Sequence, residues 1–401
     1  MPDRIFAGLK VIDCASFIAA PAAATILSDF GAEVIKIEPP GEGDPYRRLS
    51  SLPGYPQSPY NYCWMLDGRN KRSLALDLSK AEGREVLHAL AAQADVFITN
   101  FPPPVRKRLG VTWEKLQPLN DRLIYASFTG YGETGEEANK PGFDSNAWWA
   151  RSGLMDMVRS SDTAPPARSV PGMGDHPSAL ALFSAIVMAL YERQSTGKGT
   201  QVGTSLIANG AWSNGCFVQA ALCDAKFQHR PPREEGRNAA AHHYQCRDGR
   251  WLLLSLLNEE RQWPVFAKCI GNEQLATDPR FQTNADRRAH SRELIAILDE
   301  IFATADLAEW RARLDAHGLI FGFMAVMDEM PHDPQMKAAN VFVPFEGDTM
   351  LTINSPMWVD GTEKVPPRHA PDVGQHSDEV LRDFGYGDDA IKQLRSDGTV
   401  S

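Results

Sequence analysis

The chain has 401 residues, of which 43% are hydrophobic, and a formal net charge of -10 at pH 7. This length corresponds to two or three domains of ordinary size, and the acidic balance argues against nonspecific nucleic-acid binding. Because the sequence has no apolar stretch of about 18 residues and no charged-then-apolar leader at its start, we expect neither a membrane span nor a secretory signal.

The first third of the chain alternates short apolar strands with helices. Strands are predicted at residues 9–14, 33–38, 72–77, 95–99 and 123–129, and helices at 21–30 and from a Ser79 cap to about Ala92. Polar and apolar residues alternate in 33–38, as in a half-covered strand. Strands separated by helices need crossover connections, so we predict a mostly parallel sheet with both faces covered. Ligands bind beyond the carboxyl ends of such strands, which here carry Ser16-Phe17, Asn100-Phe101 and Gly130-Tyr131-Gly132.

The remainder of the chain indicates a second, smaller region and a return to the first. A long apolar helix is predicted at 179–193, and the glycine-rich segment 197–200 reads as a helix-to-strand turn and not as a phosphate loop. After the polar stretch 228–238, a strand at 251–256 and helices from Glu259 and at 285–302 predict a small α+β domain. Strands at 341–343 and 350–353 and an amphipathic segment at 377–394 follow. We interpret this tail as part of the first domain, which makes the small domain an insertion.

Asp175 stands in a Gly-Asp-His-Pro run directly before the long helix. A carboxylate at this position can cap the helix, and it can also serve as an accessible nucleophile. The local sequence leaves both interpretations open. Trp148 and Trp149 could line an acyl pocket, although aromatic residues on a helix more often belong to the core.

The potential metal ligands do not form a recognisable site. His242 and His243 are adjacent in a predicted strand, so their side chains should point to opposite faces. The six cysteines are scattered without a Cys-x-x-Cys pair, which is typical of reduced thiols in a cytoplasmic protein. We therefore expect no metal and no disulfide frame.

Ordered motifs run through nearly the whole chain. The N-terminal ones are Leu9-Lys10-Val11-Ile12-Asp13, the run from Phe30 to Gly41 with Gly43-Asp44, Asn70-Lys71-Arg72-Ser73-Leu74, Asn100-Phe101 and Gly130-Tyr131-Gly132. The later ones are the run from Thr196 to Val202, Asp333-Pro334-Gln335, the run from Ala370 to Leu381, and Phe384-Gly385-Tyr386. With these motifs the chain resembles the family III CoA-transferases, which include the formyl-CoA and carnitine-CoA transferases and the α-methylacyl-CoA racemases.

The resemblance implies a large α/β domain with a Rossmann-like parallel sheet, built from both termini, and a smaller inserted α+β domain in an interlocked homodimer. The corresponding boundaries are residues 1–210 for the N-terminal part of the large domain, 211–232 for a linker, 233–325 for the small domain, and 326–401 for a second linker and the C-terminal return.

The resemblance also implies that Asp175 is the nucleophile in a transfer of CoA from an acyl-CoA to a small carboxylic acid. Coenzyme A is then a substrate, and no cofactor is bound permanently. The carboxylate would form an aspartyl anhydride and then an aspartyl-CoA thioester. Since aspartate has a pKa near 3.9, we expect Asp175 to be mostly ionised at pH 7 without a general base. CoA-binding positions are implied at Phe17, Arg72, Asn100, Phe101, Arg108 and Lys140.

Two alternatives remain beside CoA transfer. The racemase branch uses a histidine in Gly-His-Asp to remove the α-proton, whereas this chain reads Gly142-Phe143-Asp144. The other alternative is a homologue that binds CoA without turnover, against which the presence of Asp175 argues. Some family members cover the site with a run of glycines, but the corresponding segment 233–243 contains only Gly236.

Overall fold

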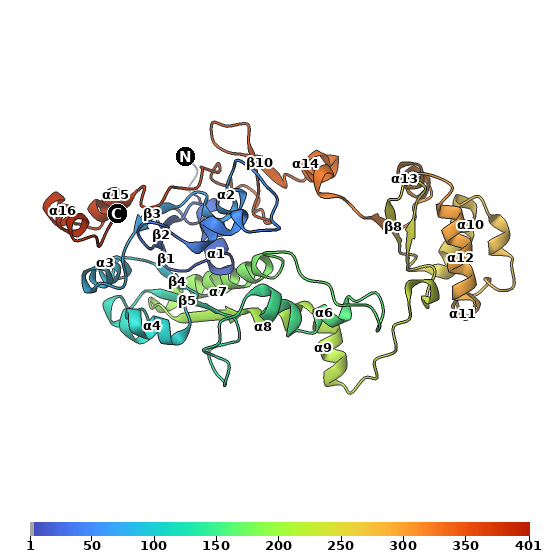
Figure 1. Cartoon of the computed structure of the whole chain (residues 1–401), viewed down its shortest axis with the longest axis horizontal. Helices are drawn as coiled ribbons and strands as arrows, with labels where there is room; N and C mark the ends of the chain where they lie inside the picture. The colour runs from blue at the N-terminus through green and yellow to red at the C-terminus, as the bar shows by residue number, and fades with distance from the viewer. Residues whose placement is uncertain (1–3) are drawn as a thin grey trace. The chain divides into compact units, whose positions relative to one another are not determined.

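The computed structural model describes residues 4–401, which divide into two compact units (Figure 1). Unit 1 comprises the chain up to Met157, Arg168–Asp224 and Gln335–Ser401, and unit 2 comprises Val158–Ala167 and Ala225–Pro334. The segment 211–232, for which we expected a linker, contains the end of helix α8 (Leu206–Ser213) and all of helix α9 (Gly215–Leu222). Among the described residues, no helix is long and apolar enough to cross a membrane.

Unit 1 is built on a six-stranded sheet in which all neighbouring strands are parallel. Its strands are β1 (Lys10–Asp13), β2 (Glu33–Glu38), β3 (Arg72–Ala75), β4 (Val96–Thr99), β5 (Ile124–Thr129) and β6 (Gln201–Ser205). Their order is β3-β2-β1-β4-β5-β6. This is the order of a Rossmann fold, so the predicted parallel sheet is confirmed. The turn at 197–200 joins helix α7 (Asp175–Thr196) to β6, also as predicted.

Successive residues of each central strand face opposite sides of the sheet, and both sides are covered. Val11, Val96 and Ile98 belong to a core shared with helix α1 (Ala19–Asp29) and α7, whereas Ile12 and Phe97 belong to a core on the other side. That second core includes residues of α3 (Ala81–Ala91), α15 (Ser377–Asp383) and α16 (Asp388–Ser396). The C-terminal helices therefore complete the same layer as α3.

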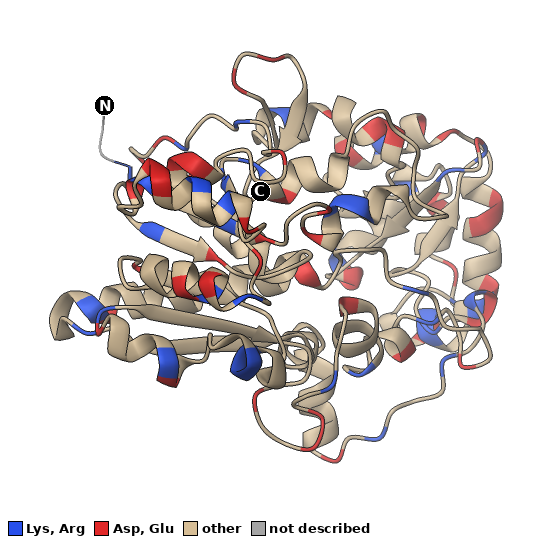
Figure 2. Ribbon diagram, turned by 60° about the vertical axis from the view of Figure 1, so that its left-hand side comes forward, with Lys and Arg blue, Asp and Glu red and all other residues tan. Residues whose placement is uncertain are grey.

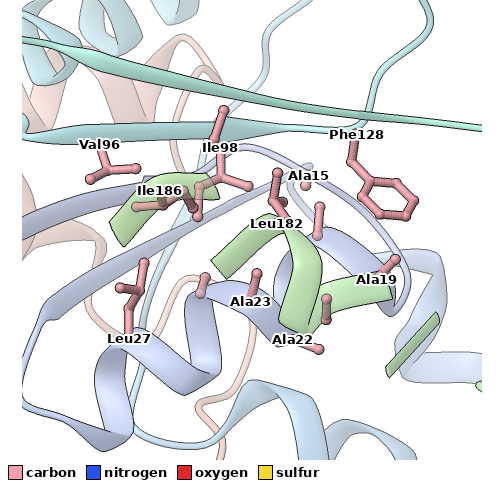
Figure 3. Packing of buried hydrophobic residues seen from close by; sticks show 14 of the residues in the cluster. Ala15, Ala19, Ala22, Ala23, Leu27, Val96, Ile98, Phe128, Leu182 and Ile186 are labelled. Carbon is pink, nitrogen blue, oxygen red and sulfur yellow. The ribbon is translucent and has the colours of Figure 1, made fainter. Parts of the chain in front are cut away.

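The small side chains of α1 allow α7 to pack closely beside it. Figure 3 shows Ala19, Ala22 and Ala23 of α1 together with Leu182 and Ile186 of α7, next to the strand residues. All of these side chains are buried. Because α7 begins at Asp175, this packing determines where the candidate nucleophile lies relative to the sheet.

Charged residues lie mainly on helices and loops, and few lie on the strands (Figure 2). One charged residue on a strand is Lys36 of β2. Its side chain is fully buried between Asp44 (Nζ–Oδ2, 2.7 Å) and Asp13 (Nζ–Oδ1, 3.8 Å). Lys71, also buried, contacts the other oxygen of Asp13 at 2.9 Å. The expectation that β2 is half covered was wrong, because two of its three polar side chains, Lys36 and Glu38, are buried in ion pairs.

Two further predictions about helices need correction. Ser79 does not cap α3: the N-cap is Lys80, and the Ser79 hydroxyl donates to Asp77 instead. The helix predicted at 285–302 is two helices, α11 (Asn284–Ala289) and α12 (Ser291–Phe302), which meet at a non-helical His290. The amphipathic segment predicted at 377–394 contains two helices, α15 and α16, and between them Gly385 adopts a φ of 92°.

The other elements of unit 1 are mostly short and lie between the main strands. They are η1 (Pro45–Ser51), α2 (Tyr62–Gly68), α4 (Pro103–Leu109), α5 (Trp113–Leu116), η2 (Gln117–Leu119), η3 (Asp144–Ala150), α6 (Leu154–Met157), α14 (Pro334–Ala338), β10 (Phe342–Pro344) and β11 (Leu351–Ile353). Of these, η3 is a π-helix, a form that often occurs at functional sites.

Unit 2 has its own hydrophobic core, formed by helices packed on a small antiparallel sheet. The sheet has the order β7-β8-β9, with β7 (His243–Gln245), β8 (Trp251–Leu254) and β9 (Phe321–Phe323). The helices are η4 (Arg233–Glu235), α10 (Glu259–Cys269), η5 (Glu273–Ala276), α11, α12, α13 (Leu307–Ala316) and η6 (Met327–His332). Buried Trp263, Phe302 and Trp310 join them into one cluster.

Candidate active site

A cavity of about 260 Å³ lies beyond the carboxyl ends of β1 and β4, where the strand order of the sheet reverses. Ligands bind at this switch point in open α/β sheets. Five residues singled out in the sequence line the cavity together: Phe17, Asn100, Phe101, Lys140 and Asp175. They come from four separate segments, which the parallel sheet brings to one edge.

The ends of β1 and β4 are joined by a reciprocal pair of hydrogen bonds. The Ser16 amide donates to the Asn100 side-chain oxygen at 2.9 Å, and the Asn100 amide group donates to the Ser16 carbonyl at 2.7 Å. This pair determines the width of the crevice. Asn100 is therefore already engaged by the protein backbone, and its first role is to shape the cavity.

Phe17 lies on the rim of the cavity in a strained backbone conformation. Its φ is 64°, a region that costs a non-glycine residue about 1–3 kcal/mol. The buried carboxylate of Asp44 accepts from the Phe17 amide at 3.2 Å and holds it in this conformation. The ring packs edge-to-face against Phe143, with ring centroids 5.6 Å apart.

Asp175 is the first residue of α7, and its side chain does not cap the helix. The N-cap is Gly174, and no side-chain capping hydrogen bond is present at this end. Within residues 4–401, the partly buried Asp175 carboxylate has no hydrogen-bond donor. Gly174 allows the indole of Trp148 to approach closely, since a Cβ there would lie 2.6 Å from the ring. The cap interpretation is wrong, and the carboxylate is unengaged at the cavity wall.

The environment of Asp175 raises its pKa to about 7. Burial is the main cause, and the nearby carboxylates of Asp144 and Asp67 add to it, while His176 acts in the opposite direction. Asp144 is held close by a hydrogen bond from the Gly174 amide to Oδ2, at 3.2 Å. With this pKa, Asp175 is about half ionised at pH 7, so our expectation that it is mostly ionised was wrong; burial and two carboxylates distant in the sequence are the reason.

We expect Asp175→Asn to stabilise the protein above pH 7. Since the carboxyl titrates near 3.8 in the unfolded chain and near 7 in the fold, the native state binds the proton more tightly. Stability is therefore lost as the pH rises from about 4 to about 7, by a few kcal/mol in total. Urea unfolding should show a larger gain for the variant at pH 8 than at pH 5. An equal gain at both pH values would contradict this account.

Two residues that sequence reasoning did not identify stand beside Asp175. The Asp67 carboxylate, 4% exposed, accepts from the Tyr46 hydroxyl (2.6 Å) and lies 3.2 Å from Nε2 of His176. Tyr46 is 2% exposed. No motif marks these residues, because Asp67 lies in α2, 109 positions before its histidine partner.

The other two predicted CoA-binding residues, Arg72 and Arg108, do not line the cavity. Arg72, at the start of β3, forms ion pairs with Glu33, Glu379 and Asp383, and it does not line the cavity. Arg108 is exposed on α4, the helix that follows the cavity residue Pro102.

Trp148 and Trp149 are also not cavity residues. Both are buried in the core that α1 and α7 share with the sheet. The core interpretation of these two residues is therefore the correct one, and Trp148 packs against the backbone at Gly174.

The chain is similar in sequence and in fold to known proteins. The model of CoA-transferase family III matches residues 6–377. The chain is 33% identical to the (R)-2-hydroxy-4-methylpentanoate CoA-transferase of Clostridioides difficile, covering 98% of both chains. It is 30% identical to the cinnamoyl-CoA:phenyllactate CoA-transferase of Clostridium sporogenes, covering 99% of this chain and 97% of the relative. The crystal structure of a CAIB/BAIF family protein from Brucella suis superposes with a TM-score of 0.85 at 28% identity, covering 95% of this chain and all of that one.

The Rossmann-type sheet and the family match define the class of the chain, an enzyme that acts on CoA thioesters. The chain belongs to CoA-transferase family III, as its motifs predicted.

Proposed function

We propose that this protein moves coenzyme A from an acyl-CoA to an acceptor carboxylic acid through covalent intermediates on Asp175. One observation carries the proposal: a partly buried carboxylate without a hydrogen-bond donor among the described residues lines the cavity at the switch point of the sheet. A carboxylate whose lone pairs are unengaged, in a site of restricted solvation, is a suitable nucleophile for a thioester.

The reaction begins when ionised Asp175 attacks the thioester carbonyl carbon. The carbon–sulfur bond breaks, CoA leaves as a thiolate, and the acyl group remains on Asp175 as a mixed anhydride. The thiolate then attacks the carbonyl carbon of Asp175, which releases the donor acid as a carboxylate and leaves CoA on Asp175 as a thioester. An acceptor carboxylate repeats the two steps in reverse, so that each barrier is lower than that of direct exchange.

Two helix N-termini support stabilisation of the oxyanions in these steps. Helix α1 begins beside Ile18 and Ala19, which line the cavity, and α7 begins at Asp175. Neither end has a side-chain cap. Backbone amides at a helix N-terminus favour negative charge, and they need no reorganisation during the reaction.

The cavity also suggests how CoA is held. Phe17 and Phe101 offer aromatic faces, and Lys140, with half of its side chain exposed, offers an ammonium group to a phosphate. Arg108 is exposed and remains a proposed phosphate contact. We do not include Arg72 in this set, because three carboxylates already neutralise it.

Formation of a covalent adduct tests the proposal directly. After mixing with an acyl-CoA, we expect intact-mass analysis to detect CoA, or its acyl group, attached to Asp175, whereas Asp175→Ala should form neither. Peptide mapping locates the modified residue. If the wild-type protein forms no adduct with any member of a broad acyl-CoA panel, the chain is a CoA-binding homologue without this chemistry.

Racemisation receives no support from the site. The position of the racemase histidine is occupied by Phe143, which packs against Phe17 and cannot accept a proton. An α-proton would therefore lack one of the two bases that act on opposite faces.

The names of the relatives guide the choice of acceptor. Both the Clostridioides and the Clostridium enzymes are named for 2-hydroxy acids with apolar side chains. We propose acids of this class as the first acceptors to test, read by mass spectrometry of the acyl-CoA products.

We also propose that the protein functions as an interlocked homodimer. Large apolar side chains on α7, α8 and α9 support an interface, since Tyr191 is 78%, Trp212 86% and Leu222 73% exposed. Sedimentation tests the proposal, and a monomer at micromolar concentration would refute it.

A further inference from the structure

The imidazole of His176 lies between two hydrogen-bond acceptors. Its Nδ1 is 3.2 Å from the Gly172 carbonyl oxygen, and its Nε2 is 3.2 Å from Oδ1 of Asp67. A carbonyl oxygen can only accept, and so can an ionised carboxylate. This geometry suits a ring that carries a hydrogen on each nitrogen, which is an imidazolium cation.

The contacts of Asp67 hold its side chain in place beside His176. Its side chain is 4% exposed, and its second oxygen accepts from the Tyr46 hydroxyl at 2.6 Å. Each oxygen of the Asp67 side chain therefore has one partner, His176 or Tyr46. The Thr25 hydroxyl donates to the Asp67 backbone carbonyl at 2.5 Å, which further fixes the residue.

The charged groups that act on Asp175 come from three elements. Asp144 of η3 and Asp67 of α2 are negative, and His176 of α7 is positive. Without the positive charge, two carboxylates and burial would both favour the protonated acid. Only the carboxylate can attack a thioester.

We propose that His176, held as an imidazolium by Asp67 and Gly172, is a positioning residue that favours the ionised form of Asp175, the nucleophile. The inference rests on the proposed function for its catalytic meaning, but its electrostatic content can be measured without any substrate. Burial disfavours the cation, yet the hydrogen bond and charge of Asp67, with the charge of Asp175, outweigh it and raise the pKa of His176.

Solvent limits the size of the effect. The His176 side chain borders a second cavity of about 340 Å³ and is 42% exposed. Water screens its charge there, so we expect a modest change in rate and not a complete loss. The influence of His176 should also disappear at high pH, where the ring is neutral and Asp175 is ionised in any case.

His176→Gln tests the proposal, with His88→Gln as a matched control. His88 is also partly buried and hydrogen-bonded to a backbone carbonyl, but it lies on α3, outside the cavity lining. In protein with 13C-labelled aspartate carboxyls, the Asp175 signal is assigned by its absence in Asp175→Asn. We expect its titration midpoint to move to higher pH in His176→Gln and to stay in place in His88→Gln.

The rate of adduct formation gives the second measurement. We expect His176→Gln to react about three- to tenfold more slowly at pH 6 and within about twofold of wild type at pH 9. A purely structural role would lower the rate at both pH values.

An unchanged Asp175 midpoint in folded His176→Gln would overturn the proposal. Should that variant fail to fold, the imidazole Cε1 signal of His176 in the wild-type protein decides: a midpoint at or below that of an ordinary histidine would also overturn it. If Asp175 shifts as expected but no protein forms an adduct, the proposed transferase function fails while the electrostatic inference stands.

Discussion

Asp175→Asn should abolish CoA exchange, with kcat falling by about 10³-fold or more. The substitution keeps the size and shape of the side chain at the start of α7, but an amide cannot form the anhydride or the thioester. Because the wild-type carboxyl has a pKa of about 7, the remaining activity should not follow the wild-type rise between pH 6 and 8. Exchange between an acyl-CoA and a labelled acid, followed by mass spectrometry, measures the loss.

The control for this variant is Asp121→Asn, an exposed residue in the turn before β5. We expect it to retain activity within about twofold, since surface substitutions away from a site change little. Exchange by Asp175→Asn at a rate near that of the control would show that the transfer does not pass through this side chain. Such a result would leave the chain in its family but remove its proposed mechanism.

Lys36→Met should destabilise the protein by about 3–5 kcal/mol, the usual result of removing one partner from a buried ion pair. Lys36 is fully buried and lies 2.7 Å from Asp44, so the substitution leaves that carboxylate without a cation. Burial alone would lower the pKa of Lys36, but Asp13 and Asp44 more than compensate and raise it above the ordinary value. The ammonium group is therefore charged at neutral pH.

The same variant should also affect the site, because Asp44 holds the strained amide of Phe17. Urea unfolding and the KM for an acyl-CoA measure the two effects. Lys115→Met, an exposed lysine on α5, is the matched control and should change stability by less than about 0.5 kcal/mol. If the free energy of unfolding of Lys36→Met lies within about 1 kcal/mol of the wild-type value, the buried ion pairs of Lys36 with Asp13 and Asp44 are not essential to the fold.

The sheet could be predicted from the sequence because its strands are short apolar runs separated by helices. The predicted strand at 33–38 coincides with β2, and those at 95–99 and 123–129 begin one residue before β4 and β5. Parallel strands place their carboxyl ends at one edge whatever the details of packing. This is why Phe17, Asn100 and Phe101, chosen from sequence, line one cavity with Asp175.

Predictions that depended on the environment of a side chain were less successful. Arg72 occupies a motif position, but three acidic side chains from β2's start and α15 surround it. The helix predicted at 285–302 is divided into α11 and α12 by the non-helical His290. Such contacts depend on which segments meet, and periodicity alone does not contain that information.

The sequence by itself determined the family, the parallel sheet and the carboxylate at the start of the long helix, because motif order, apolar periodicity and helix signals are local properties of the chain. Only the tertiary structure decided the ionisation of Asp175, the pairing of His176 with Asp67, and the burial of Lys36. These are electrostatic properties, and they depend on distances between charges and on exclusion of water. Both are established only when residues far apart in the chain pack together.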